Sequence, residues 1–412
     1  MLGLIFVCLI NIHSLDLRWE TPLSTETRPH PALTPLSTRA KATRSQTRSN
    51  NLRLALQIIY SEGPTSRAHV ARASHLTPAT ASALVDELID VGLVIEAGIG
   101  PSAGGKPPKL VAPNPEGRSI IALDISSSWF QGAVVDLSGD LVTTESVPAA
   151  TGEAAITTVI EMVSTLAAES PAPLLGVGIG TPGVVDPATG IVTSANLGWQ
   201  EAPLGARLRE QIDAGVHITN DAQAAALHEY SVHAPEVSSL ALVQVGRGIG
   251  TGHVLDGHLF HGENKTTGEI GHVRLDDGGR RCSCGNTGCL ETQASMSALL
   301  HAVGGDQSLT HERIAEVAAD PEARPAIEAA AIALGRGLAP MVALLANREI
   351  VLWGEVTSLD EPYRQLVESE IRGRVLPVNT DQIEVRFATA GGDAVIRGAA
   401  ALVLSSELGV VW

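Results

Sequence analysis

Three of the four cysteines in the chain fall within eight residues, at Cys282, Cys284 and Cys289. A histidine, His272, stands ten positions before the first of them. Three thiolates and one imidazole make a complete tetrahedral ligand set for zinc, and a site with all four positions filled is structural rather than catalytic. We therefore expect His272, Cys282, Cys284 and Cys289 to hold a structural Zn²⁺. The alternative interpretation is a set of reduced thiols in a buried core.

Acidic residues flank this cluster on both sides. Glu269 lies in the segment Gly268–His272, and Glu291 follows Cys289 after a single leucine. A loop held by a metal would fix the backbone from which both carboxylates project. The alternative interpretation is that the two glutamates bind no ligand and are ordinary solvated carboxylates on the surface.

Composition and charge bound the kind of protein that presents this cluster. The 412 residues are enough for two or three domains, and the chain is 44% apolar with only 3% aromatic residues, so its core must be mainly aliphatic. The net charge is −17, but residues 1–118 hold 12 basic and 9 acidic residues. A mildly basic front on an acidic body indicates a polyanion-binding module at the N-terminus.

The compartment follows from the cysteines and the start of the chain. Clustered cysteines in a long chain indicate a reducing compartment rather than a disulfide framework. The apolar start, Met1–Ile12, lacks the basic region and nearby cleavage site of a signal peptide, although a signal peptide is the alternative. No later stretch is long and apolar enough to span a bilayer. We expect a cytoplasmic protein that does not associate with a membrane.

Residues 48–113 show the element order of a winged helix-turn-helix domain. Apolar residues recur at helical spacing from Leu52 to Ile59, and a short helix follows over 66–73, with Thr65 as its expected N-cap. Thr77-Pro78 is expected to begin a third helix. The threonine side chain can cap the first turn, and a backbone N–H at the first helical position has no acceptor within the helix, so proline costs nothing there. Two strands around a glycine-rich tip form the wing. The alternative is a helical hairpin in a partner-binding module.

The candidate DNA contacts lie on the third helix and the wing. The start of that helix has no Arg or Lys, so its short polar side chains are expected to contact phosphates or thymine methyl groups. Basic residues around it would bind phosphates. The candidates are Thr77, Thr80 and Ser82 on the helix, with Arg67, Arg72, Lys106 and Lys109 nearby.

The rest of the chain alternates strands and helices. Buried-strand patterns occur at 120–125, 175–180 and 350–353, a hairpin is expected from 240–245 and 252–259, and helical patterns occur at 154–168, 326–345 and 393–404. This mixture predicts sheets covered on their faces by helices. We divide the chain into a disordered tail at 1–47, the winged helix-turn-helix domain at 48–113 and an α/β domain at 118–412.

The cysteine cluster, read with its flanking motifs, resembles the signature of the ROK family (repressor, open reading frame, kinase). The Gly-Glu-Ile-Gly-His segment, the Cys-x-Cys-Gly-x-x-Gly-Cys run and Leu290-Glu291 all agree with that signature. The turn at Gly178–Gly183 and the segment Asn196–Trp199 resemble two further family motifs. The resemblance implies an actin-like, sugar-kinase fold with two α/β lobes around a cleft. The N-terminal winged helix is the arrangement of the repressor branch.

The same resemblance implies which residues bind sugar. Thr219-Asn220-Asp221 matches the sugar-binding Asn-Asp of the family, and in a kinase Asp221 would be the general base. On sequence alone, Asp221 is also a good helix N-cap. Carboxylates and an amide on fixed backbone can satisfy several sugar hydroxyls at once. The implied sugar-binding set is Asn220, Asp221, Glu269, His272 and Glu291.

The nucleotide-binding motifs depart from the kinase pattern. Kinases of this fold carry Asp-x-Gly-Gly-Thr, whose glycines let the backbone approach phosphate; this chain has Asp124-Ile125-Ser126-Ser127-Ser128. The second phosphate loop, at Gly246–Gly252, is also altered, and the adenosine region at Gly391–Ala394 is only loosely recognisable. We therefore expect sugar binding without phosphorylation and no catalytic residue.

These observations favour a transcriptional regulator of carbohydrate genes, a repressor by resemblance, that binds operator DNA and takes a sugar or sugar derivative as effector. A homodimer or homotetramer is expected, because two winged helices select a palindromic operator. The alternative is an ATP-dependent, glucokinase-like sugar kinase of the ROK family.

Overall fold

The computed structural model describes residues 44–101, 107–126, 128–233, 238–262, 266–389 and 391–410. Arg48–Trp412 forms one compact unit. The expected tail at 1–47 lies outside the described residues except for its last four, which are already helical because α1 spans Arg44–Glu62. Lys106 and Ser127, both named above, also lie outside them.

The helices and strands that follow α1 have the expected winged helix-turn-helix order. Helix α2 (Arg67–Ala73) and helix α3 (Pro78–Asp90) precede the antiparallel strands β2 (Val94–Ile99) and β3 (Lys109–Pro113). Thr77 caps α3, accepting a hydrogen bond from the Thr80 amide at 3.2 Å, as expected. The cap of α2 is Ser66, not Thr65.

The physical reason for this correction is where the helix begins. Thr65 and Ser66 both form β1, which pairs antiparallel with β3, and α2 begins only at Arg67, so Thr65 lies one residue too early to cap it. The Ser66 hydroxyl is at the right position and accepts from the His69 amide at 3.2 Å.

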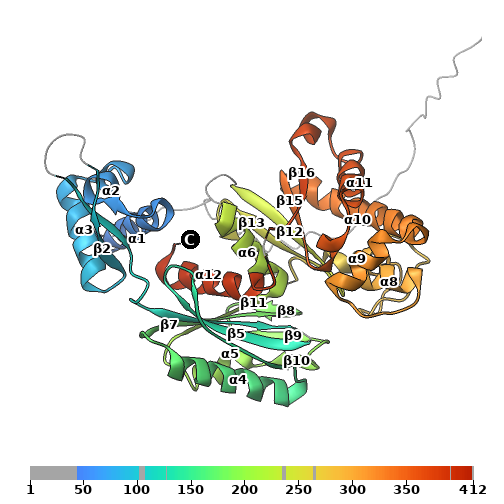
Figure 1. Ribbon diagram of the computed structural model, residues 1–412, viewed down its shortest axis with the longest axis horizontal. Helices are drawn as coiled ribbons and strands as arrows, with labels where there is room; N and C mark the ends of the chain where they lie inside the picture. The colour runs from blue at the N-terminus through green and yellow to red at the C-terminus, as the bar shows by residue number, and fades with distance from the viewer. Residues whose placement is uncertain are drawn as a thin grey trace, which may run out of the picture. The chain divides into compact units, whose positions relative to one another are not determined.

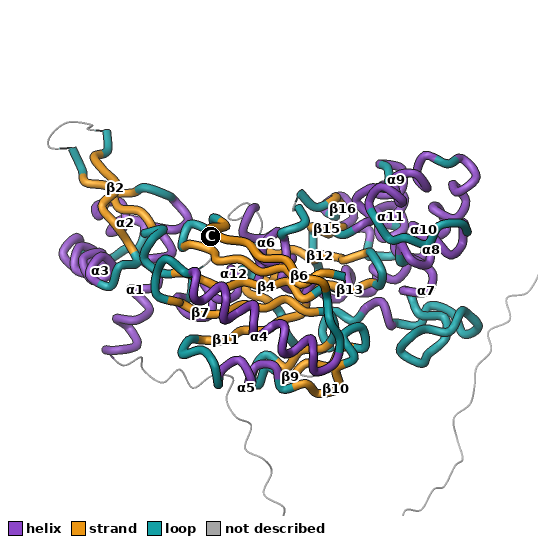
Figure 2. The backbone as a smooth tube through the Cα atoms, turned by 60° about the horizontal axis from the view of Figure 1, so that its bottom comes forward, coloured by secondary structure: helices purple, strands orange, loops and turns teal. Residues whose placement is uncertain are grey.

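The first lobe is a five-stranded sheet with strand order β11-β7-β4-β5-β6. Strands β4, β7 and β11 run parallel to one another, so their carboxyl ends lie at the same edge of the sheet, whereas β5 runs antiparallel to β4. Helices α4 and α5 lie along one face of this sheet and α12 lies on the other (Figures 1 and 2). The elements are β4 (Ser119–Ile125), β5 (Trp129–Asp136), β6 (Leu141–Pro148), α4 (Gly152–Glu169), β7 (Leu174–Thr181), α5 (Leu204–Arg209), β11 (Gly215–Asn220) and α12 (Ala394–Leu408).

A small antiparallel sheet is inserted between β7 and α5. It consists of β8 (Val184–Asp186), β9 (Ile191–Ser194) and β10 (Trp199–Ala202), in the order β10-β9-β8. Trp199 is buried, and its indole N–H donates to the Gly152 carbonyl at 2.8 Å.

The second lobe is a five-stranded sheet with strand order β14-β13-β12-β15-β16. The antiparallel pairing of β12 with β13 confirms the expected hairpin, although its second strand begins at Ile249, three residues early. The sheet elements are β12 (Ser239–Val245), β13 (Ile249–Leu255), β14 (His258–Leu259), β15 (Glu349–Trp353) and β16 (Glu384–Phe387). The helices are α6 (Asp221–His233), α7 (Glu291–Ala294), α8 (Met296–Val303), α9 (His311–Ala319), α10 (Arg324–Leu345) and α11 (Glu361–Arg372), with short 3₁₀ turns η1 (Ile270–His272), η2 (Pro321–Ala323), η3 (Glu355–Ser358) and η4 (Pro377–Gln382).

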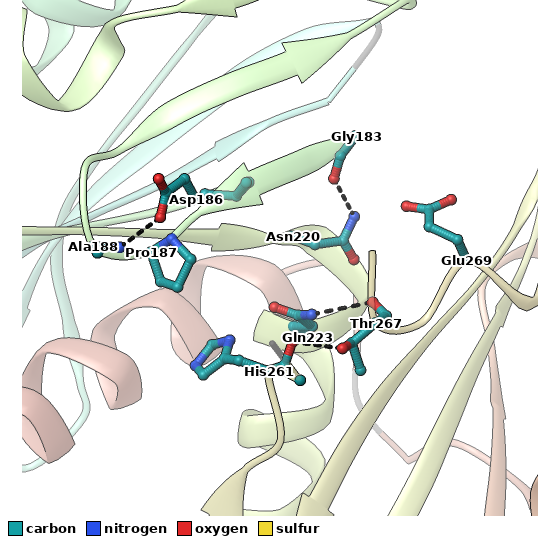
Figure 3. A pocket seen from close by; sticks show the side chains of 11 residues that line it. Gly183, Asp186, Pro187, Ala188, Asn220, Gln223, His261, Thr267 and Glu269 are labelled. Atoms are coloured by element: carbon teal, nitrogen blue, oxygen red, sulfur yellow. Dashed lines mark hydrogen bonds between the residues drawn. The ribbon is translucent and has the colours of Figure 1, made fainter. Parts of the chain in front are cut away.

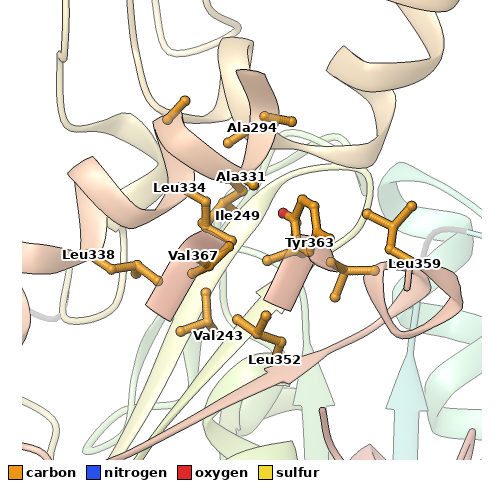
Figure 4. Close-up of a cluster of buried hydrophobic side chains, with 14 of the residues drawn as sticks. Val243, Ile249, Ala294, Ala331, Leu334, Leu338, Leu352, Leu359, Tyr363 and Val367 are labelled. Atoms are coloured by element: carbon orange, nitrogen blue, oxygen red, sulfur yellow. The ribbon is translucent and has the colours of Figure 1, made fainter. Parts of the chain in front are cut away.

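Alternation along β12 explains why both faces of this sheet are covered. Val243 and Val245 belong to the apolar cluster under α10 and α11, whereas Leu240 and Leu242 belong to the cluster under α6. Figure 4 shows Leu334 and Leu338 of α10 lying over Val243 and Leu352. Successive side chains of a strand point to opposite faces, so an unbroken apolar run predicts a sheet buried on both sides.

Within the described residues, one helical segment, Pro321–Leu345, is long and apolar enough to cross a membrane by length and composition, which corrects the expectation that no later stretch would be. Within its most apolar window, 61% is buried inside the fold. The segment is the core helix α10 and the turn before it, so its hydrophobicity is explained by packing.

Candidate functional site

The candidate effector site begins where β11 ends and α6 starts. The Asn220 amide N–H donates to the Gly183 carbonyl at 3.1 Å, and its carbonyl oxygen accepts from the Ala222 amide at 2.9 Å. Asn220 thereby fixes the turn after β7 against the start of α6. A cavity of about 240 Å³ opens here. Figure 3 shows the side chains that line it.

Two members of the expected sugar-binding set, Asn220 and Glu269, line this cavity. Four polar side chains that the sequence did not single out also line it: Asp186, Gln223, His261 and Thr267. Gln223 was detectable, because it follows Asn220 by three residues and so lies on the same side of the first helical turn. Asp186 and His261 come from distant turns, and no local pattern marks them.

Asp221 lies next to the cavity, half-buried at the start of α6. Its carboxylate accepts from the Gln244 side-chain amide at 3.2 Å and from the Ala222 amide at 2.9 Å. Burial raises the pKa of Asp221, and these hydrogen bonds oppose that rise. Asp221 is itself the first residue of α6, and the side chain before the helix that accepts from its first turn is that of Asn220, so Asn220 and not Asp221 stands at the cap position.

Glu269 and His272 bring the cavity and the cysteine cluster together. The Nε2 atom of His272 lies 3.6 Å from Oε2 of Glu269, and its Nδ1 atom lies 3.5 Å from Sγ of Cys282. Burial raises the pKa of Glu269; the charge of His272 opposes this rise, whereas Asp221 and Glu291 add to it. One imidazole therefore presents one nitrogen to each site.

The four expected zinc ligands converge. The ligand atoms of His272, Cys282, Cys284 and Cys289 all lie within 4.8 Å of one another. The chain turns tightly between them: the Cys282 amide donates to Asn286 O at 2.8 Å, and a glycine follows Cys284 with a φ of 95°. The donor set and the spacing of its atoms fit a tetrahedral zinc ion, which would hold the loop between Glu269 and Glu291.

Glu291, the last expected sugar ligand, turns toward the second phosphate loop instead of the cavity. Its Oε2 atom accepts from the Ile249 amide at 3.3 Å, and its Oε1 atom lies 3.8 Å from Sγ of Cys282. The Gly246 amide donates to Gly248 O at 3.0 Å within the loop. Two backbone N–H groups of this loop, those of Gly246 and Ile249, are therefore already bonded within the chain.

The first phosphate loop is closed in a similar way. The Ser126 hydroxyl donates to the Trp129 carbonyl at 2.7 Å, which fastens the turn between β4 and β5. Asp124, just before it, is 9% exposed, and its Oδ1 atom has no hydrogen-bond partner among the described residues. Burial, with a contribution from the charge of Asp221, raises the pKa of Asp124 to about 8. The altered sequence therefore gives a loop closed by its own side chain.

Some of the candidate DNA-binding residues are free of ion pairs among the described residues, and others are already paired with acidic side chains. Thr77 and Thr80 are exposed at the start of α3 with their hydroxyls 2.8 Å apart, while Ser82 is half-buried. Arg72 is exposed and has no ion-pair partner among the described residues.

Two of the expected phosphate contacts are instead paired with acidic side chains of the same domain. The guanidinium of Arg67 bonds Asp86 at 2.8 Å, and the ammonium of Lys109 bonds Glu96 at 2.7 Å. Sequence reasoning missed both pairs, because the partners lie 19 and 13 residues away.

The fold and the site together define a class: an actin-like protein of the sugar-kinase type, with two α/β lobes and a winged helix-turn-helix domain before them. The family model of the ROK family matches residues 120–406, and the chain belongs to this family.

Three similar proteins represent both branches of the family. The xylose repressor of Caldicellulosiruptor bescii is 30% identical over 87% of this chain and 96% of its own length. The glucokinase of Halalkalibacterium halodurans is also 30% identical, over 70% of this chain and 96% of its own. A crystal structure of a ROK family transcriptional regulator, described as a homologue of the Escherichia coli Mlc protein, has a TM-score of 0.77 and 24% identity, covering 88% of this chain and 98% of that one.

Proposed function

We propose that the protein is a DNA-binding transcriptional regulator of carbohydrate metabolism genes, a repressor whose effector is a sugar or sugar derivative. The observation that carries the proposal is the extent of the match to repressors. The xylose repressor aligns over 87% of this chain and 96% of its own length, whereas the glucokinase, at equal identity, covers 70% of the chain. The extra coverage supports the proposal because it is about the size of the N-terminal segment in which the winged helix-turn-helix domain lies.

The effector site is the cavity at the start of α6, with Asn220, Asp221, Glu269, His272 and Glu291 as the sugar-binding set. Asn220 and Glu269 line the cavity, and Asp221 and His272 lie beside them. An amide, two carboxylates and an imidazole on fixed backbone offer donors and acceptors to several hydroxyls at once. Glu291 would join them only if its bond to the Ile249 amide opened.

Zn²⁺ is the proposed structural cofactor, held by His272, Cys282, Cys284 and Cys289. Four protein ligands leave no open position, so the ion would brace the loop and take no part in chemistry. With the metal on Nδ1, His272 would keep its Nε2 as an N–H donor toward Glu269 and the sugar.

The DNA-binding module is proposed to be residues 48–113, and the effector-binding domain residues 118–412. Thr77, Thr80 and Ser82 would face the major groove, with Arg67, Arg72, Lys106 and Lys109 toward the phosphates. Sugar binding would favour one arrangement of the two lobes, and a difference in operator affinity between arrangements would switch repression. A regulator of this kind acts on DNA, which places the protein in the cytoplasm, as a homodimer or homotetramer without membrane association.

The alternative function, sugar phosphorylation, is disfavoured by the two phosphate loops. One is closed by the Ser126 hydroxyl, and in the other Glu291 occupies the Ile249 amide. A carboxylate in that position also repels a phosphate. ATP would have to displace these bonds before its phosphates could bind.

The decisive experiment measures operator binding, sugar response and ATP turnover with one preparation of the full chain. DNA fragments that the protein binds and enriches supply the operator sequence. A panel of monosaccharides then tests whether a sugar releases the protein from that DNA. We expect release by at least one sugar, loss of that response in Asp221→Asn with operator binding kept, and an unchanged response in the surface control Asp213→Asn. Turnover of ATP above about one per second, an ordinary rate for kinases, would establish the alternative.

A further inference from the structure

The three cysteines of the proposed zinc site differ in how far solvent reaches them. Cys284 is exposed, whereas Cys282 is 5% exposed and Cys289 is 0% exposed. The oxidation of a cysteine depends on its exposure as well as on its charge, so buried sulfurs are protected from a solute. Among these three, Cys284 is therefore the sulfur that an oxidant in solution reaches first.

A second sulfur lies within reach of Cys284. Its Sγ atom is 3.7 Å from Sγ of Cys289. A disulfide bond is about 2.05 Å long, so the two atoms need to approach each other by less than about 2 Å. The Sγ atom of Cys282 faces other groups, since it lies 3.5 Å from Nδ1 of His272 and 3.8 Å from Oε1 of Glu291. The structure thus favours Cys284 and Cys289 as the pair that can join.

The backbone between these two cysteines lets Cys284 move while Cys289 stays fixed. A Cβ built on Gly285, next to Cys284, would meet nothing within 4 Å among the described residues. At the other end Gly288 is tightly enclosed, because a Cβ there would collide with the carbonyl oxygen of Asp276. The approach of the two sulfurs therefore needs movement at the open end of the turn and none in the core where Cys289 is buried.

We propose that Cys284 and Cys289 form a hydroperoxide-sensitive dithiol whose oxidation releases the zinc ion. The sulfur of Cys284 attacks one peroxide oxygen and the O–O bond breaks, which leaves a sulfenic acid and, from hydrogen peroxide, a water. The sulfur of Cys289 then attacks the sulfenic sulfur, so that an S–S bond forms and the hydroxyl leaves as a second water. Two electrons pass from the two thiolates to the peroxide, and two protons from solvent complete the waters.

The disulfide removes two of the four zinc ligands. His272 and Cys282 remain, and they are too few for a structural zinc site. Disulfides in a reducing compartment are commonly transient and serve redox sensing, and thiols reverse them. The consequence for the effector rests on the proposed function: without the ion the loop between Glu269 and Glu291 loses its brace, so the oxidised protein should lose its response to sugar.

Peroxide titration of the zinc-loaded full chain tests the proposal without DNA or sugar. A chelating dye measures the released zinc, and a thiol reagent counts cysteines after unfolding. We expect release of about one zinc ion per chain as a pair of thiols disappears, reversed by dithiothreitol with added zinc. Trypsin cuts after Arg281 and Arg313, so all three cysteines lie in one peptide. Alkylation of the unfolded chain should mark Cys282 directly, and Cys284 and Cys289 only after reduction.

Cys284→His is the most direct test variant. It keeps four zinc-binding side chains, because two cysteines and two histidines are a common structural set, but it lacks the exposed sulfur. It should bind zinc and retain it at peroxide concentrations that empty the wild type. Cys8→Ser is the matched control, since it removes the cysteine outside the cluster and should release zinc like the wild type. If Cys284→His binds no zinc, the peptide map of the wild type decides alone.

Several results would overturn the proposal. They are zinc that stays bound while Cys284 is oxidised, a disulfide between Cys284 and Cys282, release from Cys284→His as complete as from the wild type, or a purified chain that contains no zinc. Failure of the proposed function is a separate result. A reduced, zinc-loaded chain that binds no operator, or that responds to no sugar, contradicts that function and leaves the zinc measurement intact.

Discussion

Gly398 of α12 lies directly against the backbone of Ala224 in α6. A Cβ built on Gly398 would collide with the Ala224 carbonyl oxygen, so at this crossing the two helices touch without an intervening side chain. Helix α6 begins at Asp221, beside the candidate effector cavity, and α12 packs on the first-lobe sheet. The position of the cavity wall therefore depends on this contact.

Gly398→Ala should destabilise the protein by about 1–3 kcal/mol, the usual cost of overpacking. The sign of this change in unfolding free energy is informative, because alanine in place of glycine at an unconstrained helical position stabilises a protein by up to about 1 kcal/mol. Denaturant unfolding followed by circular dichroism measures the change. Gly392→Ala is the control, since a Cβ there meets nothing within 4 Å. Equal stability of the two variants would contradict the tight crossing.

Cys284→Ser should release the metal and weaken sugar binding. Loss of one thiolate leaves three ligands for the ion, and the loop between Glu269 and Glu291 then loses its brace. Elemental analysis of the purified protein measures zinc, and thermal shift with the effector sugar measures binding. Ser283→Ala, one residue away, should keep both its zinc and its affinity for the sugar. Sugar affinity that stays unchanged in a zinc-free Cys284→Ser protein would exclude the bracing role.

Asp124 should make the protein less stable as the pH rises. Its pKa is raised from 3.8 to about 8 in the folded chain, so the folded state holds a proton that the unfolded state has lost. The stabilisation that protonated Asp124 contributes is fully present below about pH 4 and is lost as the pH rises to about 8. The total loss is at most about 1.4 kcal/mol for each unit by which the folded and unfolded pKa values differ. Comparing denaturant unfolding of the wild type and Asp124→Asn at pH 5.5 and 8 isolates this contribution. A difference between the two proteins that is the same at both pH values would show that Asp124 is not protonated in the fold.

Arg72→Ala should weaken operator binding and reduce the slope of log affinity against log salt by about one, as expected for one lost phosphate contact. Lys109→Ala should do less, because the Lys109 ammonium is already bonded to Glu96 at 2.7 Å. Fluorescence anisotropy with labelled operator across a salt series measures both. A larger loss in Lys109→Ala would mean that DNA displaces Glu96 from the lysine.

Much of the candidate site could be predicted from short stretches of sequence. The zinc ligand set is readable because its chemistry depends on residue type and on spacing within a single loop. The Thr77 cap is readable for the same reason, since backbone hydrogen bonding over a few residues determines it. The predicted cap of α2 is wrong, because the strand that pairs with β3, more than forty residues away, continues through Ser66 and the helix begins only at Arg67.

The sequence by itself determined the ligand chemistry, the element order and the family to which these motifs belong. Only the tertiary structure decided which polar groups remain available. It turned Glu291 toward the Ile249 amide, placed Asp186 and His261 in the cavity wall, and paired Lys109 with Glu96. The physical reason is that local patterns record what a side chain can bind, whereas its partner is selected by burial and contact between segments far apart in the chain.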